Sequence, residues 1–314
     1  MAIQRFPLRK EEHPDHFLYD FEGLMIKTDR WDRKENDRVL VLGRGVGVHV
    51  LMNYMQNHPE LVRGKDIFEP FAGSGPMGLL SLKLGAKHAD LLDINPRAIQ
   101  FMKENVARNR FDESQYSIHE EDISQYHPSQ KCDILFANPP FIPVPDDVGM
   151  PIHSDGGTDG NRLTNILLSK VDDFLKPQGE AFLVVFQVED QHGPLLLYGI
   201  RQYVTKRHVE LTRMQSESFN FNDMVSEYIA NVPKKRQEIL TWSELMKKQY
   251  GEHLTINYYV IHVGKERNAP AGYTIREYER ESDVEKYGKG FHNVDYSSKD
   301  HFIEIRVFVE KEES

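Results

Sequence analysis

Four consecutive residues near the middle of the chain have the chemistry to hold a flat nitrogen group. A short apolar run over 134–137 ends at Asn138, and Pro139, Pro140 and Phe141 follow. A proline has a fixed φ and no N–H to give to a sheet, so we expect a buried strand to end here in a rigid segment. The Asn138 side chain and the main-chain carbonyl of Pro139 could each accept one N–H of an amide or amino group, and Phe141 could stack on its plane. The alternative is that Asn138 only terminates the strand in a turn.

A second set of suitable residues follows an earlier strand. Gly73, Gly75 and Gly78 have the spacing G-x-G-x-x-G between an expected strand and an expected helix, and Asp93 closes the next strand. Glycines at these places allow a tight turn and close approach of a ligand, while a carboxylate like that of Asp93 can accept hydrogen bonds from both hydroxyls of a ribose. The set predicts a nucleotide-like ligand. A structural loop that merely needs small residues is the alternative.

Acidic residues indicate which nucleotide-like ligand fits. Glu69 ends the strand before the glycines, where a carboxylate would repel the pyrophosphate of a dinucleotide at the helix N-terminus. It suits instead a ligand with an ammonium and a sulfonium group, which is S-adenosylmethionine. Asp122 follows a third strand and could accept from the adenine amino group. Glu69 could alternatively complement the helix dipole, and Asp122 could be a solvated turn residue.

These residues need a scaffold that places several strand ends side by side. Strands are expected over 66–71, 89–94, 116–122, 132–138 and 180–187, alternating with helices over 76–85, 96–109 and 161–175. Such alternation predicts right-handed βαβ crossovers and a mostly parallel sheet with helices on both faces. Ligands bind such sheets outside the carboxyl ends of the strands, where the residues above are found.

The segment 63–187 resembles the class I S-adenosylmethionine-dependent methyltransferases. "EPFAGSG" is similar to their first motif, "DLLDINPRAI" to the second, "EEDI" to the third and "NPPF" to the fourth. The resemblance implies a doubly wound, Rossmann-like α/β fold whose mostly parallel seven-stranded sheet has a final antiparallel strand. The cofactor-binding residues that it implies are Glu69, Phe71, Ala72, Gly73, Ser74, Gly75, Asp93, Ile94, Asp122, Ile123 and Asn138, and the catalytic ones are Asn138, Pro139, Pro140 and Phe141.

The motifs indicate the reaction more closely than the substrate. "NPPF" marks the branch of this family that methylates planar nitrogens, and 156–185 resembles the segment that follows the motif in protein-glutamine N5-methyltransferases. Residues 71–93 are also similar to rRNA guanine-N2-methyltransferases, whose fourth motif normally begins with Asp. We therefore expect an N-methyltransferase, with protein glutamine ahead of an RNA base (guanine-N2 or adenine-N6) and a small molecule. A non-catalytic S-adenosylmethionine-binding protein is disfavoured by the intact "NPPF", and a nicotinamide dehydrogenase by Glu69.

Composition restricts the partners and the location. The 314-residue chain has 39% hydrophobic and 28% charged residues, as a globular protein does. Its net charge of −10, from 49 acidic and 39 basic side chains, favours a protein or small-molecule partner over RNA. No apolar run is long enough to span a membrane, and the first residues lack a signal-peptide pattern, so we expect a cytoplasmic protein without a membrane partner.

The flanking regions are expected to add to the site. Residues 1–62 combine strand-like runs over 17–26 and 38–43 with a helix over 48–58, and we expect them to pack on the core and border the site. An antiparallel pair over 207–214 and 254–266 should complete a core over 63–265, with a helical insertion over 215–253 as a lid. Within it, Thr241 and Glu244 have the spacing of a capping box. Residues 266–314 are expected to be a turn-rich extension with an edge strand over 301–313.

Other residues that could do chemistry have simpler interpretations. Cys132, the single cysteine, is expected to be a small buried apolar side chain. His13 and His16 flank a proline without a helical pattern, so we predict no metal site. His49 is expected to be a packed or surface residue near the cofactor. The cluster over 155–159 lacks the distal glutamate of a calcium loop, so we interpret it as a loop on the substrate side.

Overall fold

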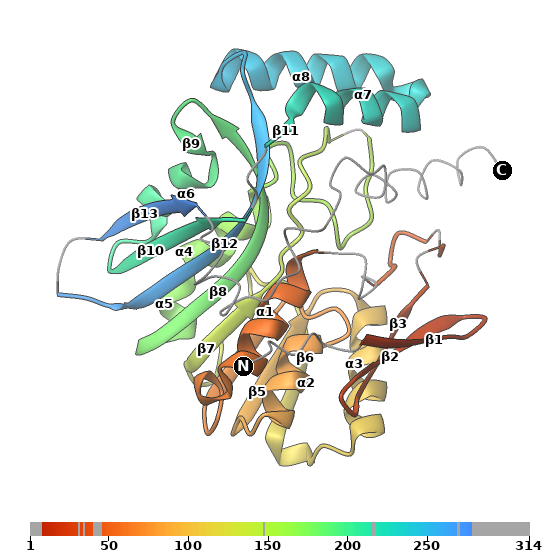
Figure 1. Ribbon diagram of the computed structural model, residues 1–314, viewed down its shortest axis with the longest axis vertical. Coiled ribbons are helices and arrows are strands. Elements are labelled where there is room, and N and C mark those ends of the chain that lie inside the picture. The colour runs from red at the N-terminus through yellow and green to blue at the C-terminus, as the bar shows by residue number, and fades with distance from the viewer. Residues whose placement is uncertain are drawn as a thin grey trace.

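The protein is built on one large sheet, with a small second sheet beside it (Figure 1). The computed structural model describes residues 8–30, 32–33, 35–39, 46–146, 148–214, 218–268 and 271–277. No helix in these ranges combines the length and the apolar character required to cross a bilayer.

The large sheet has ten strands. Its parallel centre consists of β4 (Asp66–Pro70), β5 (His88–Asp93), β6 (Tyr116–Glu120), β7 (Cys132–Ala137) and β8 (Leu175–Asp190). β12 (Thr255–Glu266) runs antiparallel to β8 and to β10 (Arg207–Arg213), and β13 (Gly272–Glu277) lies parallel to β10 at the edge. The strand order is β13-β10-β12-β8-β7-β4-β5-β6, and the short strands β9 (Gly193–Pro194) and β11 (Phe219–Asn220) pair with β8 and β12. Without β13 and the two short strands, this is the predicted seven-stranded sheet with one antiparallel strand.

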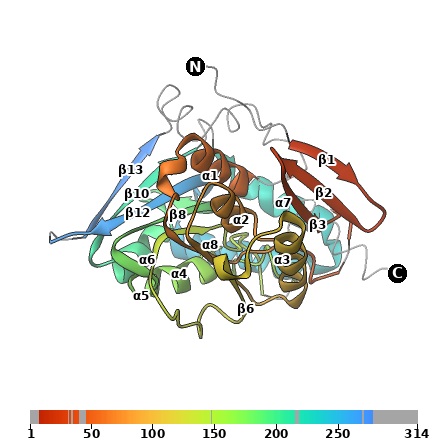
Figure 2. The same ribbon diagram turned by 90° about the horizontal axis from the view of Figure 1, so that it is seen from below.

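Helices cover both faces of the sheet, as the alternating pattern predicted. α1 (Val46–Asn57), α2 (Pro76–Lys83) and α3 (Pro96–Asn109) lie on one face, and α4 (Arg162–Ser169), α5 (Val171–Phe174) and α6 (Leu196–Tyr203) on the other (Figure 2). Phe136 and Phe182 join the core under the first group, and Leu135 and Leu183 the core under the second. β7 and β8 are apolar on both faces because each face is buried. The 3₁₀ turns η1 (Pro59–Leu61) and η2 (Glu113–Gln115) precede β4 and β6.

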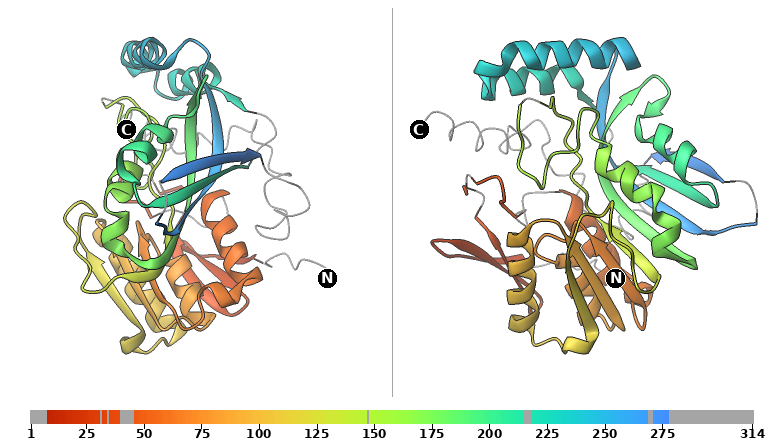
Figure 3. Two further views of the ribbon diagram at one scale, coloured as in Figure 1. Left: turned by 90° about the vertical axis from the view of Figure 1, so that its left-hand side faces the viewer. Right: turned by 180° about the vertical axis from the view of Figure 1, so that it is seen from behind.

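The N-terminal region forms its own three-stranded antiparallel sheet of β1 (Leu8–Glu12), β2 (His16–Phe21) and β3 (Leu24–Asp29). This small sheet lies beside α3 (Figure 3). The run expected over 17–26 is thus a hairpin, with Glu22 and Gly23 at its turn. Of the run expected over 38–43, only Arg38 and Val39 are described, and neither is in a strand. The helix expected over 48–58 is α1.

The insertion between β10 and β12 is a helical pair at the carboxyl edge of the sheet. α7 (Phe221–Asn231) and α8 (Arg236–Tyr250) are joined by the 3₁₀ turn η3 (Pro233–Lys235), at the top of Figure 1. The predicted capping box is wrong, because α8 begins at Arg236 and Thr241 is an exposed residue inside it. The turn that starts at Pro233 leads directly into α8, so the helix needs no start at Thr241.

The sequence also missed a strand. Gly272–Glu277 was expected to be turn-rich but forms β13. None of its residues is buried, and the alternation of Tyr273 and Ile275 with polar residues is too short to predict a strand. The edge strand expected over 301–313 lies outside the described residues.

Candidate functional site

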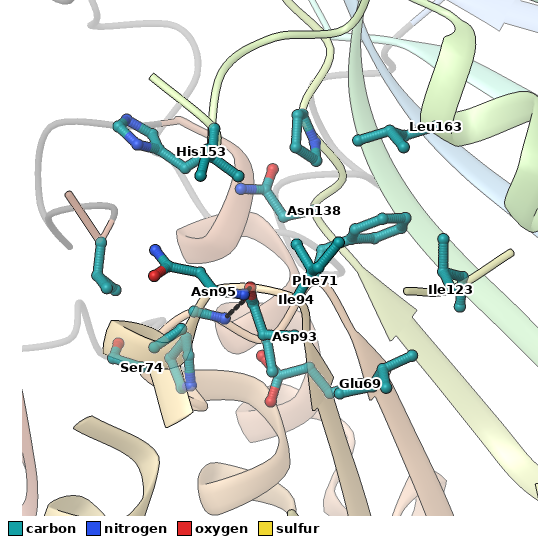
Figure 4. Close-up of a pocket in the computed structure, with 18 of the residues that line it drawn as sticks. Glu69, Phe71, Ser74, Asp93, Ile94, Asn95, Ile123, Asn138, His153 and Leu163 are labelled. Carbon is teal, nitrogen blue, oxygen red and sulfur yellow. Dashed lines mark hydrogen bonds between the residues drawn. The ribbon is translucent and has the colours of Figure 1, made fainter. Parts of the chain in front are cut away.

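A pocket opens at the carboxyl ends of β4, β5, β6 and β7 (Figure 4). It has about 120 Å³ of room for the centres of water molecules. Parallel neighbouring strands end at one edge, which brings residues distant in sequence together. The predicted residues that line the pocket are Glu69, Phe71, Ala72, Gly73, Ser74, Asp93, Ile94, Asp122, Ile123, Asn138 and Pro140. Gly75, Pro139 and Phe141 lie in the same segments but are not among the lining residues.

The loop between β4 and α2 depends on its glycines. Gly73 and Gly75 have φ values of 55° and 78°, which L side chains rarely adopt. Gly78 lies on the first turn of α2, where a Cβ would come within 2.3 Å of the Leu91 side chain and 3.0 Å of the Glu69 carboxylate. The missing Cβ therefore lets α2 pack closely on the sheet.

Asp93 fastens this loop to the end of β5. One carboxylate oxygen accepts the Gly73 N–H at 2.8 Å, and the other accepts the Asn95 N–H at 2.9 Å. Each carboxylate oxygen has a second lone pair that a ligand can use. Burial raises the pKa of Asp93, and the backbone N–H groups oppose this effect.

Glu69 is fully buried beneath the same loop. Its two oxygens accept the N–H groups of Met77 at 3.2 Å and Gly78 at 2.6 Å. It thus complements the N-terminus of α2, the alternative that the sequence left open, while also bordering the pocket. Burial raises the pKa of Glu69 to about 8, because removal from water disfavours the charged carboxylate.

We expect Glu69 to make the ligand-free protein less stable as the pH rises. Its carboxyl has a pKa of 4.5 when unperturbed and about 8 in the folded protein, so its stabilising contribution is complete below the first value and lost as the pH rises through the second. Urea unfolding over this pH window should show a fall in the free energy of unfolding of up to a few kcal/mol that Glu69→Gln removes. An identical pH dependence in the two proteins would contradict the raised pKa.

The ends of β5 and β6 contribute an apolar surface with an acidic edge. Ile94 is 53% exposed although it is a large apolar residue, and Ile123 is buried beside the pocket. An exposed apolar side chain at a pocket offers a contact for a flat ring. Asp122 is exposed, and its Oδ1 accepts the Ser124 N–H at 2.7 Å, so it forms the turn considered as an alternative while it borders the pocket.

Asn138 supplies an acceptor without a partner. It follows β7, and its Oδ1 is buried with no hydrogen-bond partner among the described residues. Figure 4 shows its amide in the pocket, between Asp93 and His153. Buried carbonyl oxygens are normally hydrogen-bonded, so this oxygen indicates a place for an N–H group that a ligand brings.

Phe141 does not present its ring to this pocket. Its ring centroid lies 6.3 Å from that of Phe186 on β8 and 6.1 Å from that of Tyr258 on β12, the second in an edge-on arrangement. Pairing of Ile142 with Asp155 holds the chain after Pro140 in this direction. The ring of Phe141 thus packs on the sheet beside the pocket, and the stacking of this ring on a substrate stays a prediction.

The loop over 154–160 supports the "NPPF" segment from outside. The N–H of Ile142 donates to Ser154 at 2.9 Å, and that of Gly156 donates back to Ile142 at 3.0 Å. A Cβ on Gly156 would lie 2.7 Å from the Phe141 backbone, and one on Gly160 would lie 2.5 Å from its carbonyl oxygen. Both glycines are therefore needed for this close approach.

The acidic residues of this loop serve the loop itself. Asp155 and Asp159 accept the N–H groups of Gly157 and Asn161, both at 2.9 Å. Within the ranges that the structure describes, no three His, Cys, Asp or Glu side chains are grouped so that they could hold a metal ion.

We expect Gly156→Ala to displace Asn138 without removing binding of the cofactor that the sequence motifs predict. The new methyl group would push on backbone atoms of Phe141, and such overpacking costs about 1–3 kcal/mol. The methyl transfer that the sequence motifs predict should fall by about tenfold or more, since 1.4 kcal/mol corresponds to a factor of ten. Gly272→Ala is the matched control, because its nearest neighbour is a side-chain atom 3.7 Å away. Equal activity of the two variants would contradict a supporting role for the loop.

Part of the pocket could not be predicted from the sequence. Residues of the lining that were missed include Arg38, Val39, Asn95, Ile152, His153 and Leu163. Asn95 carried a usable signal, because it directly follows Asp93 and precedes a proline, as a helix cap does; its Oδ1 accepts the Arg97 N–H at 3.0 Å. The other residues carry no local signal.

The N-terminal contribution to the pocket is held by a buried carboxylate. Asp29 is fully buried and accepts the Val39 N–H at 2.9 Å and the Arg97 Nε–H at 2.8 Å. Asn95 also donates to the Asp37 carbonyl at 2.7 Å. These contacts tie the end of β3 and the segment after it to the first turn of α3.

The remaining chemically suggestive residues have structural roles. The ring of His49 lies 6.5 Å from that of Phe21, and burial lowers its pKa to about 4, so it is neutral. Cys132 is buried, as predicted, and burial raises the pKa of its thiol, which makes it a poor nucleophile. His13 and His16 stack on each other at 4.4 Å.

Comparison with known proteins gives matches of limited length. A family described as "Conserved hypothetical protein 95" matches residues 49–146. A Methanocaldococcus jannaschii protein named as a candidate protein N5-glutamine methyltransferase is 30% identical over 122 residues, which are 38% of this chain and 60% of that protein. Ribosomal RNA large subunit methyltransferase I of Shewanella denitrificans is 32% identical over 84 residues, which are 25% of this chain and 21% of that protein. The chain thus spans less than two thirds of the length of either relative.

Several solved structures are similar over most of the chain. One of them, M. jannaschii TYW2 in complex with AdoMet, has a TM-score of 0.47 and 12% identity, over 82% of this chain and 89% of that one.

The order of the core strands identifies the fold. From one edge it is β6-β5-β4-β7-β8-β12-β10, and β12 alone of these seven runs antiparallel to its neighbours. The chain has the class I methyltransferase fold. Both sequence relatives are methyltransferases by name, which confirms the resemblance inferred from the motifs. The family match over 49–146 contains the glycine loop, Asp93 and Asn138, so it covers the strand ends of this methyltransferase fold that line the pocket.

Proposed function

We propose that this protein is an S-adenosylmethionine-dependent N-methyltransferase that acts on a planar amide or amino nitrogen. The orphaned Oδ1 of Asn138, in the same pocket as Asp93, is the observation that carries the proposal. Asn138 can accept an N–H of the substrate, and Asp93 can accept ribose hydroxyls of the cofactor. One pocket could therefore hold both reactants beside each other, which lowers the entropic part of the barrier.

The residues present fit the cofactor. Asp93 would bind the ribose hydroxyls, and the glycine loop, without side chains at its left-handed positions, would let the methionine part approach the backbone. Ile94 and Ile123 would contact the adenine ring, and Asp122 its amino group. The lining carboxyl groups of Asp93, Glu121 and Asp122 suit a cationic ligand better than a pyrophosphate.

The chain's own acceptors would activate the substrate nitrogen. When bound, S-adenosylmethionine supplies an electrophilic methyl group on a sulfonium sulfur. A planar nitrogen is a poor nucleophile, because its lone pair is delocalised into the neighbouring π-system. Asn138 Oδ1 and the Pro139 carbonyl would each accept one N–H, which orients the lone pair and favours the positive charge that develops on nitrogen. The prolines fix the backbone, so these acceptors need little reordering. Once the nitrogen carries the methyl group it is positively charged and acidic, so it can lose its proton to water.

We favour a protein glutamine as the methyl acceptor. The likeness of residues 156–185 to protein-glutamine methyltransferases, the net charge of −10 and the Asn at position 138 support it. The name of the M. jannaschii relative agrees with this choice. An RNA base is the second candidate, favoured by the sequence of the glycine loop and by the name of the Shewanella relative. A small-molecule acceptor and a cytoplasmic location also stay predictions.

The regions around the core would shape the substrate side. We propose residues 1–62 as a unit that borders the site, 63–265 as the catalytic core and 215–253 as a lid within it. Support for the lid comes from two contacts: the Tyr228 hydroxyl donates to the Pro143 carbonyl at 2.7 Å, and Trp242 Nε1–H to the Thr158 carbonyl at 2.9 Å. Both acceptors lie in the loops that follow Asn138. Residues 266–314 are proposed as a C-terminal extension, of which β13 adds an edge strand to the large sheet.

The test is incubation of the protein with methyl-labelled S-adenosylmethionine and a lysate divided into protein, RNA and small-molecule fractions. Label in the protein fraction, on glutamine after hydrolysis, is the expected result. Label in RNA would select the second candidate. Cofactor binding without label in any fraction would favour a non-catalytic binding protein, and binding of NADH but not of S-adenosylmethionine would overturn the proposal.

A further inference from the structure

Two asparagines on α3 take the place of a partner strand for the N-terminal sheet. β3 pairs with β2 on one side only, and its other edge faces α3. Asn109 accepts the Met25 N–H at 2.8 Å and donates to the Met25 carbonyl at 2.7 Å. Asn105 accepts the Lys27 N–H at 2.8 Å and donates to the Lys27 carbonyl at 3.1 Å.

The spacing of the two asparagines explains this match. Residues four apart in a helix are about 6 Å apart along the axis, and residues two apart in a strand are separated by about 6.6 Å. Asn105 and Asn109 therefore meet alternate residues of β3, whose peptide groups point the same way. The edge of the small sheet is satisfied by side chains in place of backbone.

The two asparagines differ in the acceptor to which the second N–H of the side-chain amide donates. Asn109 gives its second amide hydrogen to the carbonyl of Asn105, within its own helix, at 2.8 Å. Asn105 gives its second hydrogen to the carbonyl of Ser74, in the glycine loop, at 3.0 Å. Asn105 is fully buried and Ser74 is 2% exposed, so water has little access to this contact. One amide thus joins the N-terminal sheet to the loop proposed to hold the cofactor.

We propose that Asn105 is a positioning residue that couples docking of the N-terminal sheet to the conformation of the cofactor loop. The effect on cofactor affinity rests on the proposed function, whereas the structural link to the loop does not. The loop needs such support because Gly73 and Gly75 lie in left-handed conformations with a large entropic cost of ordering. Holding Ser74 between them keeps the loop in the conformation in which the Gly73 N–H meets Asp93.

Coupling of this kind is reciprocal. If the docked sheet favours the conformation of the loop that binds the cofactor, the cofactor must stabilise docking of the sheet by the same factor. The backbone amides of Met25 and Lys27 should therefore exchange more slowly with solvent when the cofactor is bound. Neither residue is among those that line the pocket, so direct contact with the cofactor would not explain the effect.

The test compares Asn105→Ala with Asn109→Ala, which removes the same number of contacts to β3 but none to the loop. We expect both variants to speed hydrogen exchange at β3. Only Asn105→Ala should speed exchange at residues 73–77 in the free protein and raise the Kd for S-adenosylmethionine, each by about tenfold, the effect of one buried hydrogen bond. Asn109→Ala should change both by less than about twofold, within ordinary mutational scatter.

Equal loop exchange in the two variants would overturn the coupling. If Asn105→Ala does not fold, exchange of the wild-type protein with and without cofactor decides, and unchanged rates at Met25 and Lys27 would overturn it. If the wild-type protein does not bind S-adenosylmethionine, the proposed function fails, while loop exchange in the free variants still tests the structural link.

Discussion

Asn138→Ala should reduce methyl transfer by about 10²–10³, the loss found when one preorganised polar contact to a developing charge is removed. The buried Oδ1 of Asn138 has no partner among the described residues, so removal of this oxygen breaks no hydrogen bond within them. The affinity for S-adenosylmethionine, measured by calorimetry, should stay within a few-fold. Such a split between turnover and binding marks an interaction made with the substrate nitrogen in the transition state.

Two further variants sharpen this result. Asn138→Asp keeps a hydrogen-bond acceptor at this position but adds a negative charge. Its activity toward the protein, RNA and small-molecule fractions of a lysate tests whether the neutral amide selects the molecule that is methylated. Asn268→Ala, at an exposed position after β12 and outside the pocket lining, is the control and should leave turnover unchanged. Unchanged turnover in Asn138→Ala would refute the mechanism.

Asp93→Ala should weaken cofactor binding by about 10²-fold, since a hydrogen bond to a charged group contributes about 1.5–3 kcal/mol. The variant would lose the acceptors for the ribose and also leave the N–H groups of Gly73 and Asn95 without their partner. The glycine loop should become less ordered for the same reason. Calorimetry with S-adenosylmethionine measures the change in Kd.

A matched control lies on the same strand. Asp90 of β5 contacts His119 at 3.1 Å, outside the pocket lining, so Asp90→Ala should leave the affinity unchanged. The affinity of Asp93→Asn for S-adenosylmethionine should lie between those of the wild-type protein and Asp93→Ala, because the amide keeps one acceptor oxygen. If Asp93→Ala bound S-adenosylmethionine with wild-type affinity, the interpretation of the pocket as a site for a nucleotide-like ligand would be wrong.

Much of the fold followed from local patterns. β7 and β8 could be recognised as strands because apolar residues fill both of their faces, and α3 because its apolar residues recur with a helical period. β13 was missed because Tyr273 and Ile275 are its only apolar side chains, and α8 was begun too late because Thr241 and Glu244 imitate a cap inside a helix. A local pattern cannot distinguish a real helix start from the same residues within a helix.

The sequence by itself determined which groups stand at the strand ends. The glycine loop, Asp93 and Asn138 could be assigned to strand ends because prolines, glycines and changes in the apolar period determine local backbone conformation within a few residues. Only the tertiary structure decided what these groups meet: Glu69 caps α2, Phe141 packs on β8 and β12, and the N-terminal segment and His153 complete the pocket. Such contacts join segments far apart in the chain, and their free energy depends on packing and burial that no short pattern records.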